Sequence, residues 1–419
     1  MAQLALRHGY KKCTHVLLKS FVTFFKTDIQ KGVFTTKDSD KSKVRHLSKE
    51  EIIKNGSIFT PKDLVLRAKE LILPHIGENT VTIDFGAGYG AFTSEFLDTP
   101  GRKIATDIDE YSVELLKQDF PQVDVRLDNS LLNISRNKFA TENEEIVVIG
   151  NPPYNDVTSQ YQRGNKGSVE MDDSIRSQDL GISFLRMYGQ IDAKYICVLH
   201  PFSYLLKKQN FKRLKEFANH YRLIKAVLFS SHEFESIKKS NTPFPVLIAL
   251  YERNDDGMSY EYIKQFKFDV YKSDKIFQIK NFNTIDGVVT KYPTKDIKDS
   301  DLQFYSLRDI NALRRNRSFL TGNCHYSVKV NAENLHYYSW LDFFKKYFKS
   351  DEMYLYGNLS PLLPEKIEDK DIKGQLYAYI LNSNAIVSKW FKDNDPEFFK
   401  THINNYYSVN RLMKLISVS

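Results

Sequence analysis

The sequence contains few cysteines and no long apolar run. Its three cysteines, Cys13, Cys197 and Cys324, lie far apart in a chain of 419 residues, and no CxxC pair occurs. This number and spacing argue against a disulfide framework and against a zinc cluster, and they favour the reducing cytoplasm. The apolar stretch 16–25 is interrupted by Lys19. It is too short to cross a membrane and lacks a small-residue cleavage site, so the sequence predicts neither a membrane anchor nor an export signal.

The chain does contain enough apolar residues for a core, and it carries an excess of positive charge. Hydrophobic residues make up 42% of it, and its length allows two domains or one α/β domain with a large appendage. The net charge of +8 favours a polyanionic partner, although mildly basic globular proteins are common. Residues 1–50 hold eleven Lys or Arg against four Asp or Glu, and residues 200–240 hold nine against three. We interpret residues 1–55 as a basic arm; for both segments, contact with a nucleic-acid backbone and a solvated surface remain alternatives.

The strongest local signal is the segment 146–154. Four apolar residues, 146–149, predict a buried strand, and Gly150 then leads into Asn-Pro-Pro-Tyr. Each proline holds the preceding residue extended and has no N–H, so the turn becomes a rigid cluster of acceptors that includes the Asn151 side-chain carbonyl. Tyr154 adds a flat ring that can stack on a planar group. A planar substrate with an NH2 group, such as a nucleobase with an exocyclic amine, suits this arrangement.

A second predicted strand, 81–85, enters a glycine-rich turn. The pattern from Asp84 to Gly90 is D-x-G-x-G-x-G, and a helical stretch, 91–97, follows. Glycines let the backbone approach a ligand closely, and a helix N-terminus offers N–H groups. The spacing is not the GxGxxG of dinucleotide enzymes, and Asp84 disfavours a pyrophosphate. Asp84, Gly86 and Gly88 therefore favour a cofactor with a cationic amino-acid end, although a lone glycine-rich turn is weak evidence.

Two further predicted strands end on carboxylates. The strand 103–106 is followed by Asp107 and Asp109, about 20 residues beyond the glycine turn, where an acid accepts hydrogen bonds from ribose hydroxyls. Asp107 is the preferred candidate. The strand 123–127 ends at Asp128, which is placed to receive an adenine amino group. Each acid alone is typical of a surface, but four consecutive strands end on a polar residue, and ligands bind at the carboxyl ends of strands in open α/β sheets.

Two segments flank this predicted site. Thr60 and Pro61 precede an amphipathic run and predict a helix with Thr60 as the N-cap and Pro61 at the first helical position. Two roles remain possible for the start of this helix: packing against the core, or contact with a cofactor. Phe234 lies in a polar connection between two late strands, so it belongs either to the core or to a second wall of a base slot opposite Tyr154. A catalytic role for His200 is not favoured, because nothing near it in the sequence pairs with it.

From residue 254 the pattern changes to short mixed segments rich in Tyr, Phe, Lys and Asn. We predict a second domain here, 254–419, with a helix over residues 375–391. Its nucleic-acid face is predicted where arginines alternate with aromatics, namely at Arg308, Arg314, Arg315 and Arg317. No metal site is predicted.

The assembled segments resemble the adenine-N6 DNA methyltransferases of restriction-modification systems, in the class whose cofactor motif precedes the catalytic motif and whose target-recognition domain comes last. The resemblance covers roughly residues 57–252. Asn-Pro-Pro-Tyr after such a strand is a strong indicator of amine methylation and a weaker indicator of DNA. The matching segments are Phe59–Pro61, Asp84–Gly88, Asp107, Asp128, Asn151–Tyr154, the strand 195–199 with Pro201 and Phe202, and Phe234 followed by the strand 246–251.

The resemblance implies an α/β fold: a Rossmann-like class I methyltransferase sheet over residues 56–253, followed by a target-recognition domain over residues 254–419. It implies transfer of a methyl group from S-adenosylmethionine to N6 of adenine in a flipped-out base of double-stranded DNA, with a cognate restriction endonuclease as partner. Catalytic roles are then expected for Asn151, Pro152, Pro153 and Tyr154, base stacking for Tyr154 and Phe234, and cofactor binding for Thr60, Pro61, Asp84, Gly86, Gly88, Asp107, Asp128 and Asn151.

Two departures keep alternatives open. Phe85 stands where DNA enzymes of this class often have proline, and the segment 84–93 is also similar to ribosomal RNA adenine dimethyltransferases. In that family leucine or a similar residue usually replaces Pro152, and the chain is much shorter. Glutamine methyltransferases of release factors share Asn-Pro-Pro-Tyr but resemble this chain little beyond it. The alternatives are therefore a ribosomal RNA adenine-N6 methyltransferase and, more remotely, a nucleic-acid-binding module with a vestigial site.

Overall fold

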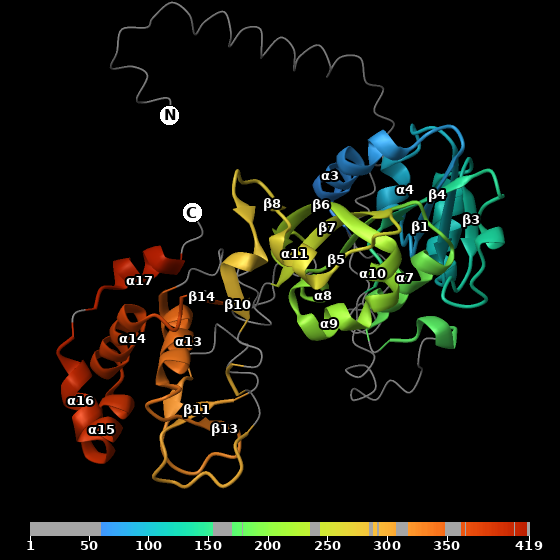
Figure 1. Ribbon diagram of the computed structural model, residues 1–419. Helices are drawn as coiled ribbons and strands as arrows, with labels where there is room; N and C mark the ends of the chain where they lie inside the picture. Colours follow the sequence, from blue (N-terminus) through green and yellow to red (C-terminus); the bar gives the residue numbers. More distant parts are fainter. Residues whose placement is uncertain are drawn as a thin grey trace, which may run out of the picture. The chain divides into compact units, whose positions relative to one another are not determined.

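The computed structural model describes residues 60–153, 170–177, 179–234, 244–284, 288–290, 293–306, 317–347, 362–364, 366–405 and 407–416. Its largest element is a nine-stranded sheet in the order β3-β2-β1-β4-β5-β7-β6-β8-β9 (Figure 1). The strands of this sheet are β1 (Thr80–Phe85), β2 (Arg102–Asp107), β3 (Asp124–Leu127), β4 (Glu145–Gly150), β5 (Tyr195–Pro201), β6 (Tyr221–Ser230), β7 (Pro245–Arg253), β8 (Phe268–Val270) and β9 (Ile276–Phe277). The helices along it are α3 (Lys62–Ile72), α4 (Ala91–Glu95), α5 (Glu110–Asp119), α7 (Leu180–Gln190), α8 (Ser203–Leu206), α9 (Lys208–Arg213), α10 (Lys215–His220) and α11 (Tyr260–Gln265).

The first five strands are parallel, and β7 is inserted antiparallel between β5 and β6. This arrangement is the Rossmann-like class I methyltransferase sheet that the sequence predicts, so the α/β fold class is confirmed. The two late strands on either side of Phe234, β6 and β7, form an antiparallel pair. The sheet continues beyond Arg253, where the sequence places the end of the catalytic domain, because β8 pairs with β6 and β9 pairs with β8.

Both faces of the sheet are covered because its central strands are apolar on both sides. In β4, Ile146 and Val148 belong to one hydrophobic cluster, whereas Val147 and Ile149 belong to another. Successive side chains of a strand point to opposite faces, so the two clusters lie on the two sides of the sheet. Helices α3 and α4 contribute to the second cluster and α7 to the first, and Figure 1 shows them on opposite sides of the strands.

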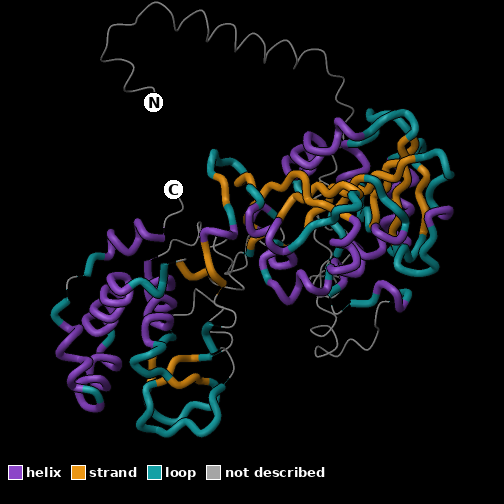
Figure 2. The backbone as a smooth tube through the Cα atoms, in the orientation of Figure 1, coloured by secondary structure: helices purple, strands orange, loops and turns teal. Residues whose placement is uncertain are grey.

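The later part of the chain contains a second set of elements. Its strands are β10 (Phe282–Thr284), β11 (Gln303–Tyr305), β12 (Phe319–Leu320), β13 (Ser327–Lys329) and β14 (Leu362–Pro364), and its helices are α13 (Leu335–Tyr347), α14 (Lys370–Ser383), α15 (Ala385–Asn394), α16 (Pro396–Ile403) and α17 (Val409–Ile416). A three-stranded antiparallel sheet has the order β12-β11-β13, and Figure 2 shows α13 to α16 packed together.

The single helix predicted over residues 375–391 is wrong. The chain forms two helices, α14 and α15, which are separated by Asn384. Asn384 has extended backbone angles, and its side chain accepts hydrogen bonds from the N–H groups of Ile386 and Val387 at 3.1 and 3.2 Å. Asparagine is unfavourable inside a helix and favourable at an N-cap, which explains the break.

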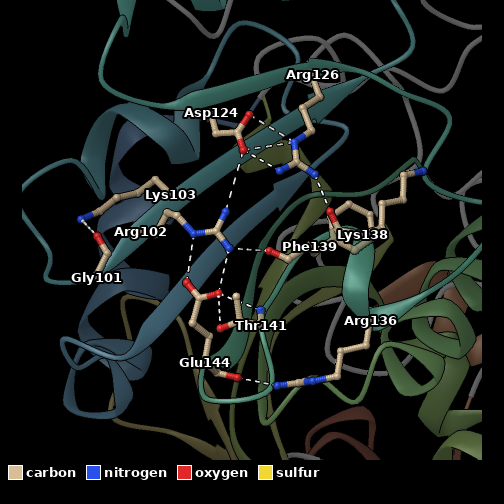
Figure 3. Close-up of polar contacts among 10 residues, drawn as sticks. All are labelled: Gly101, Arg102, Lys103, Asp124, Arg126, Arg136, Lys138, Phe139, Thr141 and Glu144. Atoms are coloured by element: carbon tan, nitrogen blue, oxygen red, sulfur yellow. Dashed lines mark hydrogen bonds and ion pairs between the residues drawn. The ribbon is translucent and has the colours of Figure 1, made fainter.

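A polar network ties the connection before β4 to the amino-terminal ends of β2 and β3 (Figure 3). The Arg102 guanidinium donates to both carboxylate oxygens of Glu144 at 3.0 Å, and also to the main-chain carbonyl of Phe139 at 2.7 Å. Arg126 pairs with Asp124 and donates to the carbonyl of Lys138 at 2.6 Å. Hydrogen bonds from Arg102 and from Thr141 lower the pKa of Glu144 to about 2. This network orders the approach to the strand that carries the candidate site.

Replacing Glu144 by glutamine should therefore lower the stability of the fold in a pH-dependent way. A carboxyl group whose pKa is lowered on folding stabilises the protein above its unfolded pKa, and this contribution is lost as pH falls through the folded pKa. We expect Glu144→Gln to reduce the free energy of unfolding by about 1 kcal/mol at pH 7. The difference from wild type should shrink between about pH 5 and pH 2. Urea unfolding at several pH values measures this, with Glu142→Gln as an exposed control; equal stability of wild type and Glu144→Gln throughout would contradict it.

Candidate active site

The two turns that the sequence singles out lie next to each other at the carboxyl edge of the sheet. Strands β1 and β4 are parallel neighbours, with Asp84 opposite Ile149. A Cβ atom at Gly150, which has φ +137°, would lie only 2.9 Å from Asp84 Oδ1, and a Cβ atom at Gly86 would lie 3.6 Å from Pro153 Cδ. The glycine-rich turn and Asn-Pro-Pro therefore form one corner. The residue at position 150 must be glycine, both for its backbone angle and for this close approach.

Asn151 is held from a third direction by the segment before α3. Its side-chain Nδ2 donates to Thr60 Oγ1 at 3.0 Å, and Thr60 is only 4% exposed. The prediction that Thr60 is the N-cap of this helix is wrong. The cap is Pro61, which is extended, and the helix begins at Lys62 without a side-chain capping bond. The Thr60 hydroxyl is thus turned to Asn151, and no sequence signal links these two positions, which are 91 residues apart.

Asp84 is a buried carboxylate that faces this corner. Its Oδ2 accepts hydrogen bonds from the Thr93 N–H at 3.1 Å and from the Thr93 hydroxyl at 2.8 Å, whereas Oδ1 points to Gly150. Burial raises the pKa of Asp84 to about 7; the Thr93 hydrogen bonds oppose the rise and the nearby Asp107 adds to it. A carboxylate whose charge is poorly compensated is well suited to bind a cation.

Asp107 is fixed by the glycine-rich turn. Its Oδ2 accepts from the N–H of Gly88 at 2.8 Å and its Oδ1 from the N–H of Asp109 at 2.9 Å. Burial raises the pKa of Asp107, and these hydrogen bonds oppose the rise. The second candidate, Asp109, caps α5 by accepting from the N–H of Ser112 at 2.9 Å.

Between the two acids lies Ile108, which sequence reasoning missed and which is 64% exposed. An apolar side chain between two aspartates at a strand end was the available signal, and it offers a surface for a planar ring.

Asp128 lies beside Asp107, since its N–H donates to the Asp107 carbonyl at 2.9 Å. Its carboxylate already has protein partners: Lys138 Nζ is 2.6 Å from Oδ1, and the Ser130 hydroxyl is 3.1 Å from Oδ2. The sequence did not indicate Lys138, because an ion pair between a strand end and the following connection has no local pattern. Contact between Asp128 and an adenine amino group remains a prediction.

Of the two aromatic residues predicted to stack on a base, the structure describes only Phe234. Tyr154 lies outside the described residues, as does the neighbouring segment up to residue 169. Phe234 is fully buried in the same hydrophobic cluster as α3, with its ring edge-to-face to Phe229 at 5.6 Å. A ring without an exposed face cannot stack on a base, so of the two roles that the sequence left open, the structure favours the core. Pro152 is buried and Pro153 is half-buried in the corner itself.

His200 has the structural role that the sequence favours for it. It is buried, its Nε2 lies 2.7 Å from the Tyr251 hydroxyl, and its Nδ1 lies 3.0 Å from the Pro201 carbonyl. The rings of Tyr204 and Tyr251 stack on it at 5.3 and 5.9 Å. Burial lowers the pKa of His200 to about 4, so it is neutral at physiological pH.

Two features are absent from the described residues: a metal-binding group of side chains and a membrane-spanning helix. Within them, no three or more His, Cys, Asp or Glu side chains are grouped so as to hold a metal ion. None of the helices in the described ranges has both the length and the apolar character needed to span a bilayer.

The sheet order and the shared corner define an α/β protein with a class I methyltransferase sheet. No protein-family model and no curated protein matches the sequence. Among solved structures, it is similar to a proposed RNA methyltransferase from Pyrococcus horikoshii, at 16% identity, over 51% of this chain and 93% of that one, with a TM-score of 0.35. It is also similar to a modification subunit of a proposed type I restriction enzyme from Vibrio vulnificus, at 13% identity over 57% of this chain and 56% of that one, with a TM-score of 0.38. The similarity to the 23S rRNA methyltransferase ErmE has 12% identity over 48% of this chain and 70% of that one, with a TM-score of 0.32.

Proposed function

We propose that this protein is an S-adenosylmethionine-dependent methyltransferase that modifies N6 of adenine in a flipped-out base of double-stranded DNA. The observation that carries the proposal is the shared corner: Gly150 lies against Asp84, Pro153 lies against Gly86, and Asn151 stands between Gly150 and Pro153 in the chain. A group that donates two hydrogens to Asn-Pro-Pro would thus be held next to a ligand bound at Gly86. A role in a restriction-modification system, with a cognate endonuclease, belongs to the same proposal.

The residues of the corner fit S-adenosylmethionine. Asp84 offers a buried carboxylate to a cationic amino group, and positive φ angles at Gly86 and Gly88 leave the turn open to close approach. Asp107 is oriented by two N–H donors, and a carboxylate retains further lone pairs for ribose hydroxyls. Ile108 offers an exposed apolar surface to an adenine ring. When bound, this cofactor supplies a methyl group on a positively charged sulfur.

The Asn-Pro-Pro turn would activate the substrate amine. The lone pair of adenine N6 is delocalised into the ring, which makes the amine a poor nucleophile. Acceptance of its two hydrogens by the Asn151 side-chain carbonyl and the Pro152 main-chain carbonyl favours the pyramidal form, whose lone pair is available. These hydrogen bonds strengthen as positive charge develops on nitrogen, so they stabilise the transition state more than the ground state. Alignment of the amine in the corner adds to this effect.

An adenine in a duplex must leave the base stack to reach the corner. Extrusion costs roughly a few kcal/mol. Stacking on an aromatic ring contributes about 1–3 kcal/mol per base and offsets much of that cost. Tyr154, directly after the corner in the sequence, is the residue that we assign to this stacking.

A basic face on α7, α9 and α10 supports a nucleic-acid substrate. The Arg186 guanidinium donates to the main-chain carbonyl of Arg213 at 3.2 and 2.7 Å and to that of Arg176 at 2.8 Å. Carbonyl partners orient a guanidinium without neutralising its charge. Three exposed lysines, which have no carboxylate partner among the described residues, lie on α9 and α10: Lys208, Lys212 and Lys215. We call Arg186 and these three lysines the basic face; it fits a phosphate backbone.

Replacing Lys208, Lys212 and Lys215 by glutamine should weaken binding of a duplex of arbitrary sequence and flatten its salt dependence. Each lost phosphate contact lowers the slope of log K against log salt by about 0.9, so the triple variant should lose up to about 3 from that slope. Fluorescence anisotropy at salt concentrations from about 50 to about 300 mM measures both the affinity and the slope.

The matched control for this experiment removes three exposed lysines from other parts of the chain, with Lys117, Lys267 and Lys275 replaced by glutamine. The control variant has the same net charge as the test variant. If the two variants bind the duplex with equal slopes, the basic face is not the binding surface.

Methyl transfer from labelled S-adenosylmethionine tests the function as a whole. Duplex DNA, ribosomal RNA and a protein with an exposed glutamine are offered in parallel, and cofactor binding is measured by calorimetry. We expect label in the duplex DNA. Label in ribosomal RNA alone would favour the RNA methyltransferase, and failure to bind the cofactor would favour a vestigial site.

A further inference from the structure

The strongest unexplained contact of the corner is the hydrogen bond between Asn151 and Thr60. The Nδ2 group of Asn151 lies 3.0 Å from Thr60 Oγ1. Thr60 is 4% exposed and precedes Pro61, whose carbonyl accepts from the N–H groups of Leu64 and Val65 at 3.1 and 3.3 Å. Leu64 and Val65 are buried in the cluster on that face of the sheet. The hydroxyl therefore projects from a rigid point, the anchored start of α3.

The orientation of the Asn151 amide decides what the corner can do. An asparagine side chain carries an acceptor oxygen and a donor NH2 at equivalent positions, and rotation by 180° exchanges them. An amine substrate donates hydrogens, so only the oxygen is useful on the substrate side. In the orientation observed, the NH2 is turned to Thr60 and the oxygen is turned away from it.

We propose that Thr60 is a positioning residue that anchors the Asn151 amide in its productive orientation. This inference rests on the proposed function, and it replaces direct cofactor contact as the role of Thr60. By accepting a hydrogen bond from Nδ2, the hydroxyl satisfies the half of the amide that the substrate cannot use. Without it, the side chain of the half-buried Asn151 loses this anchor and can rotate away from the orientation in which its oxygen meets the substrate amine.

The test compares three variants under saturating cofactor and DNA. Thr60→Val keeps the shape of the side chain but removes the hydroxyl, and it should lower kcat by about 10- to 100-fold, the loss expected when a half-buried polar group loses one hydrogen-bond partner. Thr60→Ser keeps the hydroxyl and should retain most of the activity. The control is Thr82→Val, which removes another buried threonine hydroxyl, one without a hydrogen-bond partner among the described residues. This control should keep the wild-type kcat.

The cofactor dissociation constant separates positioning from cofactor contact. If Thr60 only positions Asn151, the cofactor dissociation constant of Thr60→Val should stay within about twofold of the wild-type value. The lost hydrogen bond then affects how Asn151 meets the substrate amine and not how the cofactor binds. A raised dissociation constant with unchanged kcat would overturn the proposal and return Thr60 to the cofactor site. Equal kcat in wild type and Thr60→Val would overturn it as well.

A spectroscopic measurement distinguishes failure of this inference from failure of the proposed function. With 15N-labelled asparagine, the Asn151 side-chain NH2 resonances are assigned by their loss in Asn151→Asp. They should shift in Thr60→Val and stay near their wild-type positions in Thr60→Ser and Thr82→Val. If wild type transfers no methyl group but these shifts occur, the function is wrong and the contact is right. Unchanged resonances in Thr60→Val would refute the contact whatever the activity.

Discussion

Replacement of Asn151 by alanine is expected to abolish methyl transfer and to leave cofactor binding intact. The change removes the side-chain oxygen that accepts a hydrogen of the substrate amine. Asp84 keeps its hydrogen bond from Thr93, and Asp107 keeps its hydrogen bond from Gly88. Loss of one preorganised partner of a developing charge costs about 100- to 1000-fold in rate in other enzymes, and we expect at least that loss in kcat. Single-turnover transfer of a labelled methyl group measures the rate, and calorimetry measures the affinity for the cofactor.

A matched control for this variant is Asn219→Ala, which truncates an exposed asparagine on α10. It should transfer methyl groups at the wild-type rate. Normal turnover in Asn151→Ala would overturn the assignment of the corner as the catalytic site. Loss of cofactor binding together with activity would show that Asn151 holds the cofactor rather than the substrate.

The second large effect is expected at Asp84, whose pKa burial raises to about 7. A cationic amino group binds to the ionised carboxylate, so binding below pH 7 must release the proton of Asp84. The affinity for the cofactor should therefore increase as pH rises from 5.5, about one and a half units below that pKa, and level off above pH 7. Asp84→Asn should lower the affinity by about 10- to 100-fold at pH 7.5, since a hydrogen bond to a charged partner is lost, and should remove most of this pH dependence.

The same titration affects stability with the opposite trend. The folded pKa of Asp84 lies above its ordinary value of 3.8, so the folded protein binds more protons between pH 4 and pH 7 than the unfolded chain. The cofactor-free protein should thus lose stability as pH rises through this window. The Asp84→Asn variant should lose less stability over the same pH range. Asp255→Asn, at an exposed position, is the control. An affinity that does not change between pH 5.5 and pH 7.5 would contradict the proposed role of Asp84 and its pKa of about 7.

The sheet and the site at its edge could be predicted because their signals are local. Runs such as 146–149 are apolar and mostly β-branched, and each ends in a turn or a polar residue, which locates the strand and its carboxyl end. Parallel strands bring these ends to one edge. The meeting of Asp84 with Gly150 follows from these two facts, and the register of β1 and β4 confirms it.

Contacts between distant segments could not be predicted in this way. The hydrogen bond from Asn151 to Thr60 depends on where α3 packs across the sheet, and a threonine before a proline resembles a helix cap in any sequence. The burial of Phe234 depends on an edge-to-face contact with Phe229, which no periodicity reveals. The ion pair of Asp128 with Lys138 likewise depends on the course of a connection rather than on its composition.

The strands in the later half of the chain could not be predicted from the sequence, for a related reason. Its strands are two or three residues long, too short for a periodic pattern to locate them. Of the arginines predicted to contact nucleic acid, Arg308, Arg314 and Arg315 lie outside the described residues, whereas Arg317 stacks on the ring of Tyr305 at 4.6 Å. The assignment of residues 254–419 as a target-recognition domain stays a prediction.

The most direct test of the central claim is the identity of the methylated nucleoside. DNA from cells that express this protein, or its Asn151→Ala variant, is digested to nucleosides and analysed by mass spectrometry. N6-methyldeoxyadenosine should accumulate with the wild type and not with the variant. Wild-type DNA without this nucleoside, or equal amounts of it with both proteins, would contradict a corner in which Asn151 presents the amino group of adenine for methylation.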